Sequence, residues 1–242
     1  METRLYTEMA ALEGAHWWFR GRRAVFLDVL RRYAPTGALL DVGLGTGANA
    51  AEFTRRGYAV TGLEPSTEAI AFAKEKVPDL RVIASPFPAR EIEAGTFDIV
   101  VLLDVIEHLE DDAHALKEVF RILRPGGIVL VTTPAFMFLW SDHDALAHHY
   151  RRYRKGELMR KLHGAGLVPA MVSYYNFFLF PAIAAVRVAQ NLLGVKKTES
   201  DFSSTPGFLN GMLATLFGAE RFLLRLGPLP WGVSLIAVAK KP

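Results

Sequence analysis

The chain has 242 residues, a length that fits one large domain, and about half of them are apolar, which is enough for one substantial core. The formal charge of +3 is too small to argue by itself for a nucleic-acid partner, and we expect none. The absence of cysteine excludes disulfides, thiolate metal sites and a cysteine nucleophile.

The N-terminal residues 1–36 are predicted to form helices that act as a lid in front of the core. The first residues lack the basic segment and apolar run of a signal peptide. The most apolar stretch, residues 177–186, is well short of the roughly 20 residues that span a bilayer. We therefore expect a cytoplasmic protein. Trp18 in this lid is a candidate acceptor contact, with core packing of an amphipathic helix as the alternative.

Short apolar runs alternate with helical segments from residue 38 to residue 133. This alternation predicts βαβ units and a parallel sheet, and we take residues 37–175 as the core of the chain. The predicted strands are Ala38–Val42, Ala59–Leu63, Leu80–Ala84, Phe97–Leu103 and Ile128–Thr133. The predicted helices are Ala48–Arg56, Thr67–Val77 after the candidate N-cap Ser66, and Asp112–Leu123.

A helix over Glu157–His163 and strands over Leu167–Tyr175 and Val233–Lys240 complete the sheet. Between those strands, residues 176–230 are rich in Phe and Leu and are predicted to form an inserted helical cap, with a polar loop at 196–204. This cap is expected to line a pocket for an apolar acceptor, to touch a membrane surface, or simply to bury itself as an ordinary helix pair.

The strongest local signal is a glycine loop between the first strand and its helix. Asp41 is followed by Gly43, Gly45 and Gly47, and Glu64 ends the next strand. Glycines let a ligand approach the backbone closely, and an acid at the tip of the second strand suits the two hydroxyls of an adenosine ribose. We infer a site for a nucleoside-type cofactor, against the alternative of a structural turn.

The charge beside the glycine loop distinguishes between cofactors. The glycine spacing differs from that of the dinucleotide fingerprint, and Asp41 directly before the turn would repel a pyrophosphate. The same carboxylate suits a cationic amino group. S-adenosylmethionine (SAM) carries an ammonium and no phosphate, so the sequence favours SAM over NAD.

Five segments together resemble the class I SAM-dependent methyltransferases, in particular their ubiquinone-biosynthesis-like type 11 branch. The similarity runs from about residue 17 to residue 166 and is highly specific for fold and cofactor. The matching segments are Asp41–Gly47, with Leu44 where Cys or Ala is usual, then 97–109 and Leu123–Gly127, followed by His149–Tyr153 and Glu157-Leu158.

This resemblance implies a fold and a set of cofactor contacts. The fold is a doubly wound, Rossmann-like α/β sheet of seven strands whose last strand is antiparallel, in a single methyltransferase domain over residues 1–242. The methionine moiety of SAM is expected over the glycine loop and its ribose on Glu64, beside Pro65. Asp104 and Val105 would lie near the sulfonium. Where the family often has an acid for adenine, this chain has Ser85, followed by Phe87.

Candidate groups for the chemistry follow the fourth and fifth strands. His108, His143 and His148 are candidate general bases, each with packing or surface exposure as the alternative. Ligands in such sheets bind beyond the carboxyl ends of strands, so the segment after the fifth strand is expected to face the acceptor. Its candidate acceptor contacts are Trp140, Tyr150 and Arg152.

A metal is not expected, although the imidazoles of His143 and His148 and the carboxylate of Asp144 could together bind a divalent metal. The sequence favours SAM-dependent methylation, most readily at oxygen, of a small or lipid-linked acceptor. The coproduct would be S-adenosylhomocysteine. The protein could also contact a membrane peripherally or form a dimer. The rivals are an NAD-dependent oxidoreductase, a SAM-binding protein without activity, and a nucleic-acid methyltransferase that uses the basic cluster at 151–155.

Overall fold

A computed structural model describes residues 3–193 and 205–242 and contains a seven-stranded sheet of order β3-β2-β1-β4-β5-β7-β6. The first five strands are parallel, and β7 pairs antiparallel with both β5 and β6. The predicted doubly wound sheet with an antiparallel last strand is therefore confirmed. The strands are β1 Ala38–Val42, β2 Ala59–Leu63, β3 Arg81–Ile83, β4 Phe97–Leu103, β5 Leu123–Pro134, β6 Val168–Tyr175 and β7 Ser234–Lys240.

Two of the helices between the strands begin at a residue whose side chain caps them. The Ser66 side chain accepts a hydrogen bond from the amide of Ala69 at the start of α4, and Asp111 caps α5 through the amide of His114. The prediction of Ser66 as an N-cap is confirmed. These helices are α3 Ala48–Arg55, α4 Thr67–Lys76, α5 Asp112–Ile122 and α7 Lys155–Gly164.

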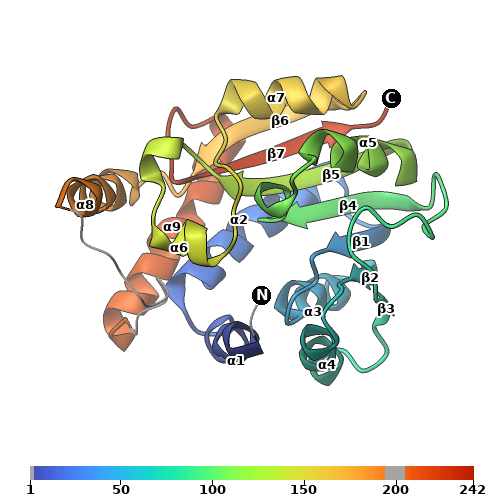
Figure 1. The fold of residues 1–242 in the computed structure, drawn as a ribbon, viewed down its shortest axis with the longest axis horizontal. Helices are drawn as coiled ribbons and strands as arrows, with labels where there is room; N and C mark the ends of the chain where they lie inside the picture. Colours follow the sequence, from blue (N-terminus) through green and yellow to red (C-terminus); the bar gives the residue numbers. More distant parts are fainter. Residues whose placement is uncertain (1–2, 194–204) are drawn as a thin grey trace.

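Helices cover both faces of the sheet and give the chain two main apolar cores. In Figure 1, α5 and α7 lie along one face, and α2 (Trp17–Tyr33) and α9 (Gly207–Leu226) pass behind the other. Side chains of α5 and α7 share one cluster with β4, β5 and β7, and side chains of α2 and α9 share the second with the opposite face of the same strands. Alternate residues of the central strands are therefore buried on both faces, as parallel sheets require.

The insertion between β6 and β7 is helical, as the sequence predicted, and it packs against the N-terminal part of the chain. It contains α8 (Phe180–Leu193) and α9, while residues 194–204, which include the predicted polar loop, lie outside the described residues. Gly21 of α2 and Phe217 of α9 are in such close contact that a Cβ at Gly21 would lie 2.5 Å from the phenyl ring. The remaining helix, α1 (Thr3–Leu12), precedes α2.

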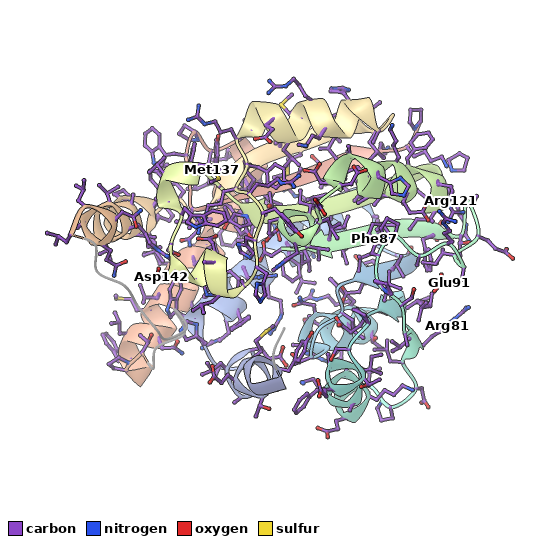
Figure 2. The ribbon with its side chains drawn as sticks, viewed as in Figure 1. Arg81, Phe87, Glu91, Arg121, Met137 and Asp142 are labelled. Carbon is purple, nitrogen blue, oxygen red and sulfur yellow. The ribbon has the colours of Figure 1, made fainter. Side chains whose placement is uncertain are left out.

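The segment after β5 leads away from the carboxyl edge of the sheet. A 3-10 turn over Met137–Leu139 precedes the short helix α6 (Asp142–Leu146). Figure 2 shows Met137 and Asp142 on this segment, near α8 and far from Phe87 and Glu91, which lie beyond β3. Within the described residues, no helix combines the length and the apolarity that crossing a membrane would need.

Candidate functional site

A cavity of about 1340 Å³ opens at the carboxyl edge of the parallel strands. It is bounded by the loops after β1, β4 and β5, by the N-terminal helices α1 and α2, and by α8. A cavity at this edge is where open α/β sheets bind their ligands. The residues singled out from the sequence that line it are Gly43, Gly45, Glu64, Asp104, Val105, His108, His143, His148, Trp18, Tyr150 and Arg152.

The glycine loop is held open by left-handed backbone conformations and by one acid. Gly43 and Gly45 have φ of +70° and +54°, and a Cβ on Gly45 would meet nothing closer than 3.9 Å, so it would enter open space. Glu64 accepts hydrogen bonds from the amide of Gly45 at 2.9 Å and from that of Ser66 at 3.1 Å. A carboxylate has about four acceptor positions, so lone pairs remain on Glu64 for a ligand that donates hydroxyl hydrogens.

Asp41 lies directly behind this loop and is 2% exposed. Burial and the neighbouring charge of Glu64 raise the pKa of Asp41 well above its usual value. Its Oδ2 atom has no hydrogen-bond partner among the described residues. A cationic group at the loop would offset the repulsion between the two acids. The donor set therefore fits an adenosyl amino acid with an ammonium group.

Helix α1 covers the cofactor end of the cavity. Its Tyr6 side chain lines the cavity and is 7% exposed. Burial and the charge of Glu64 raise the pKa of the Tyr6 phenol, so the hydroxyl stays protonated and can donate. Glu13, which follows α1, accepts a hydrogen bond from the hydroxyl of Thr46 at 2.5 Å and pairs with Lys76 at 3.0 Å. These contacts fix the predicted N-terminal lid to the glycine loop.

Five predicted contacts do not line the cavity. Asp41 lies behind the loop, and Gly47 (φ +82°) begins α3, where a Cβ would lie 2.6 Å from Ala73 of α4. Pro65, Ser85 and Trp140 also lie outside the cavity lining. Pro65 is exposed, the Ser85 hydroxyl donates to the carbonyl of Pro86, and Trp140 is half-buried on the segment after β5. Phe87, labelled in Figure 2, packs against the apolar core of the α5 face.

Asp104 at the end of β4 belongs to a partly buried ion pair. Arg22 of α2 donates to its carboxylate at 2.5 Å, and the hydroxyl of Thr132 donates at 3.0 Å. The guanidinium of Arg22 also lies 4.4 Å from the centre of the Trp18 ring. Trp18 thus reaches the cavity as predicted, but its indole face is covered by Arg22 and helps to hold that cation on Asp104.

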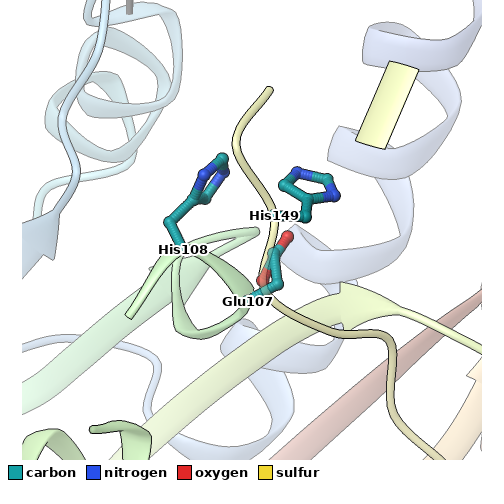
Figure 3. A group of neighbouring side chains, drawn as sticks. All are labelled: Glu107, His108 and His149. Atoms are coloured by element: carbon teal, nitrogen blue, oxygen red, sulfur yellow. The ribbon is translucent and has the colours of Figure 1, made fainter. Parts of the chain in front are cut away.

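Three imidazoles approach one another beyond β4 and β5, and His149 is the central one. Its Nδ1 lies 2.9 Å from the buried carboxylate of Asp144, and its ring centre lies 4.5 Å from that of His108 and 6.2 Å from that of His143. Figure 3 shows His149 and His108 above Glu107. An imidazole oriented by a buried carboxylate is the arrangement of a general base.

The protonation states around His149 are set by burial and pairing. Burial and the neighbouring His149 lower the pKa of His108 to about 4, so its ring is neutral near pH 7. Burial opposes ionisation of Asp144, but hydrogen bonds from His149 and Arg152 outweigh it and hold the pKa of Asp144 well below its usual value. Burial and the nearby Asp104 raise the pKa of Glu107 well above its usual value.

Glu107, His108 and His149 have potential ligand atoms that all lie within 4.8 Å of one another. Two imidazoles and a carboxylate can hold a divalent cation. This set differs from the rival set weighed from the sequence, because Asp144 accepts hydrogen bonds from Arg152 at 2.8 and 2.9 Å and is already paired.

The other predicted groups on this segment have different environments. The guanidinium of Arg152 is buried on Asp144 and on the carbonyl of Ala135, so it holds the segment together instead of offering a free cation. His148 is exposed, in a left-handed backbone conformation (φ +56°), and Tyr150 is 54% exposed at the cavity rim.

Sequence reasoning missed His149, Glu107, Arg22 and Asn176, all of which line the cavity. His149 and Glu107 stand inside segments that were singled out, but nothing in the sequence tells which of two adjacent side chains turns inward at an irregular segment. Asn176 directly follows β6 at the carboxyl edge, and that position is the signal that could have found it.

The comparisons with known proteins agree with this geometry. Residues 40–131 match the methyltransferase domain family Methyltransf_11. The "probable S-adenosylmethionine-dependent methyltransferase" of Mycolicibacterium smegmatis is 31% identical over 156 residues, covering 62% of this chain and 59% of that protein. The ubiquinone biosynthesis O-methyltransferase of Caulobacter vibrioides is 35% identical over 100 residues, covering 39% of this chain and 40% of its own. The chain thus spans about half the length of the curated relatives it matches.

Solved structures share the fold at low sequence identity. A chain from the complex that contains the Haloferax volcanii Trm112 methyltransferase activator superposes with a TM-score of 0.63 at 18% identity, covering 99% of this chain and 94% of its own. Phosphoethanolamine N-methyltransferase 2 of Haemonchus contortus, solved with SAM, superposes with a TM-score of 0.59 at 22% identity, covering 89% of this chain and 52% of its own. Residues 40–131 are thus similar to a methyltransferase domain, and the seven-stranded sheet that contains them has the fold of the solved methyltransferase structures.

Proposed function

We propose that this protein transfers the methyl group of SAM to a hydroxyl oxygen of a small or lipid-linked acceptor. One observation carries the proposal: a single cavity joins the glycine loop and its acid Glu64 to the imidazole cluster around His149. The first half suits an adenosyl amino acid and the second suits removal of a proton from an acceptor. SAM, when bound, supplies a methyl carbon activated by its sulfonium.

The residues of the cofactor half bind and orient. The carboxylate of Glu64 accepts from the ribose hydroxyls with the lone pairs that Gly45 and Ser66 leave available. An ammonium at the loop favours the ionised form of Asp41, whose pKa is otherwise raised by burial and by Glu64. Helix α1 covers this half and excludes water, which strengthens each of these interactions.

In the acceptor half, His149 takes the proton. Asp144 holds the Nδ1 proton of His149, which leaves Nε2 as the basic atom and stabilises the imidazolium that forms. This assignment replaces His143 and His148 as the first candidate base. His108 lies beside His149, but its pKa of about 4 makes it a weaker base.

A base at the acceptor favours oxygen because a neutral hydroxyl is a weak nucleophile until its proton leaves. The relatives include an O-methyltransferase and also the ubiquinone/menaquinone biosynthesis C-methyltransferase UbiE of Geotalea daltonii, which is 33% identical over 118 residues. Oxygen is thus preferred from the chemistry of the site, with carbon as the second candidate.

A lipid-linked acceptor would reach this cavity past the inserted helices. Apolar side chains on α8 and α9 are exposed, among them Leu192 (81%), Leu193 (76%) and Phe208 (87%). Exposed apolar groups of this size mark partner or membrane surfaces. Co-sedimentation with anionic vesicles would support peripheral membrane contact, and a monomer–dimer equilibrium in sedimentation would assign the same surface to a second copy.

The decisive experiment titrates the protein with SAM, S-adenosylhomocysteine and NADH by calorimetry. Binding of SAM and its coproduct, with release of the coproduct in the presence of hydroxylated acceptors, supports the function. Binding of NADH alone would establish the oxidoreductase, and SAM binding without turnover across a broad acceptor panel would establish a binding protein. Turnover on RNA that collapses with salt would establish a nucleic-acid methyltransferase.

A further inference from the structure

The side-chain amide of Asn176 lies at the cavity without a hydrogen-bond partner among the described residues. It directly follows β6, which runs parallel to β5, so it lies at the same edge of the sheet as Asp104. The residue is 1% exposed and lines the cavity. Neither the oxygen nor the nitrogen of its side-chain amide has a hydrogen-bond partner among the described residues.

Such an amide is costly for a protein to keep. Buried polar groups are nearly always hydrogen-bonded, and an unpaired one loses its interaction with water without replacement. The backbone of Asn176 is left-handed, with φ of +57°, a conformation that asparagine tolerates better than most residues. The cost of the unpaired amide is recovered if a ligand bonds to it.

The conformation of Asn176 is fixed from the inserted cap. Glu220 of α9 is fully buried, and its Oε1 accepts hydrogen bonds from the amides of Phe177 at 2.8 Å and Phe178 at 3.1 Å. The carboxylate therefore holds the turn directly after Asn176. Glu220 acts as a positioning residue, and through it α9 determines where the Asn176 amide points.

The chemistry of this amide favours a neutral acceptor. Two of the four arginines that line the cavity, Arg22 and Arg152, are paired with Asp104 and Asp144. An amide offers one donor group and one acceptor atom side by side. Two adjacent hydroxyls match it, since one hydroxyl accepts from Nδ2 and its neighbour donates to Oδ1. A carboxylate anion would face Oδ1 with no hydrogen to donate.

We propose that Asn176 orients the acceptor by a two-point hydrogen bond to a vicinal diol, and that Glu220 holds it in place to do so. The inference rests on the proposed function, because the diol then carries the oxygen that is methylated. The shared chemistry is the pair of neighbouring hydroxyls, which a saturated sugar ring and a catechol ring both provide.

The test uses the full chain saturated with S-adenosylhomocysteine, titrated with catechol or with methyl α-D-glucopyranoside in a ¹H–¹⁵N NMR experiment. The side-chain amide signals of Asn176 should shift with at least one diol, and the ring type that binds identifies the source. Phenol and cyclohexanol, with one hydroxyl each, should bind about fivefold more weakly, the effect of losing one hydrogen bond. No shift with either diol, or equal affinity for the single alcohols, would overturn the proposal.

Variants separate this role from the fold. Asn176→Asp keeps the shape and tolerates φ > 0, and once ionised it has no donor, so the preference for a diol should disappear at a pH above the pKa of the new carboxyl, while Asn191→Asp on α8, where residue 191 is exposed, should keep the preference. Glu220→Gln retains the acceptor oxygen and should preserve diol binding, whereas Glu220→Ala should lower it.

Affinity for SAM should remain at the wild-type value in every variant. A wild-type protein that does not bind SAM would refute the proposed function, and an unchanged preference for the diol in Asn176→Asp would refute this inference alone.

Discussion

Replacing Glu64 by glutamine tests the cofactor half of the cavity without changing its shape. Both carboxylate oxygens accept from backbone amides, Oε2 from Gly45 and Oε1 from Ser66. The glutamine side chain has only one acceptor oxygen, so in either orientation its NH₂ group faces a backbone N–H. No rotation of the amide satisfies both positions.

Two losses follow from this mismatch. The ribose of SAM loses a hydrogen bond to a charged acceptor, which amounts to about 1.5–3 kcal/mol. This corresponds to roughly a 10- to 150-fold increase in Kd. The backbone N–H left without an acceptor costs about 1–3 kcal/mol of folding stability.

Calorimetric titration of Glu64→Gln with SAM measures the first loss, and urea unfolding without cofactor measures the second. Glu75→Gln is the matched control, since Glu75 is exposed on α4 and the charge change is the same. Its Kd and unfolding midpoint should stay at wild-type values. SAM affinity of Glu64→Gln within twofold of wild type would refute the assignment of Glu64 to the ribose.

Gly47→Ala should lower the free energy of unfolding by about 2–4 kcal/mol, because the new Cβ would lie 2.6 Å from Ala73 at a left-handed φ. Gly57→Ala is the control: φ is +86° there and the space around it is open, so the loss should be only about 1 kcal/mol. Equal losses for the two variants in urea unfolding would contradict the packing role of Gly47. His108 has a folded-state pKa of about 4, below its unfolded value of 6.5, so its neutral form contributes stability that is fully present above pH 6.5 and is lost as the pH falls toward 4. His108→Asn should therefore flatten the loss of unfolding free energy in this window by up to about 3 kcal/mol with EDTA present, and an unchanged pH profile would count against the buried neutral ring. His149→Ala should lower kcat about 10²- to 10⁴-fold with SAM affinity unchanged in calorimetry, and a wild-type kcat would remove His149 as the base.

The sheet was predictable because residues that end strands stand at the limits of most of its apolar runs. The predicted bounds of β1, β2 and β4 match the structure, since glycine, proline or aspartate limits each apolar run. The start of β5 was wrong by five residues. Pro125 and the two glycines after it looked like a turn, yet the backbone of Gly126 and Gly127 bonds to Lys241 at the end of the chain. That pairing is long-range and leaves no local pattern.

The cofactor half of the site was more predictable than the acceptor half. Gly43, Gly45 and Glu64 sit on a strand–loop–helix unit whose geometry follows from the sequence. His149 instead belongs to an irregular segment that follows the five-residue helix α6. Reciprocal hydrogen bonds between Ser141 and Asp144 cap the start of α6, and this local structure sets which way each side chain of the segment turns. The role of any imidazole there depends on a carboxylate pairing that the sequence pattern does not encode.

Helix α9 is fastened at both ends to parts of the chain far away in sequence. The side chain of Asn210 bonds to the backbone at Ala15 and Trp17, and Glu220 bonds to the turn after β6. The residues proposed to bind SAM come from the first 105 positions, whereas another part of the cavity is lined by α8 and by Asn176, which precedes the turn that α9 holds through Glu220. Substitutions in the insertion can therefore change the acceptor while the residues that bind the cofactor stay the same. Engineering of acceptor specificity should begin in the insertion, at residues 176–226.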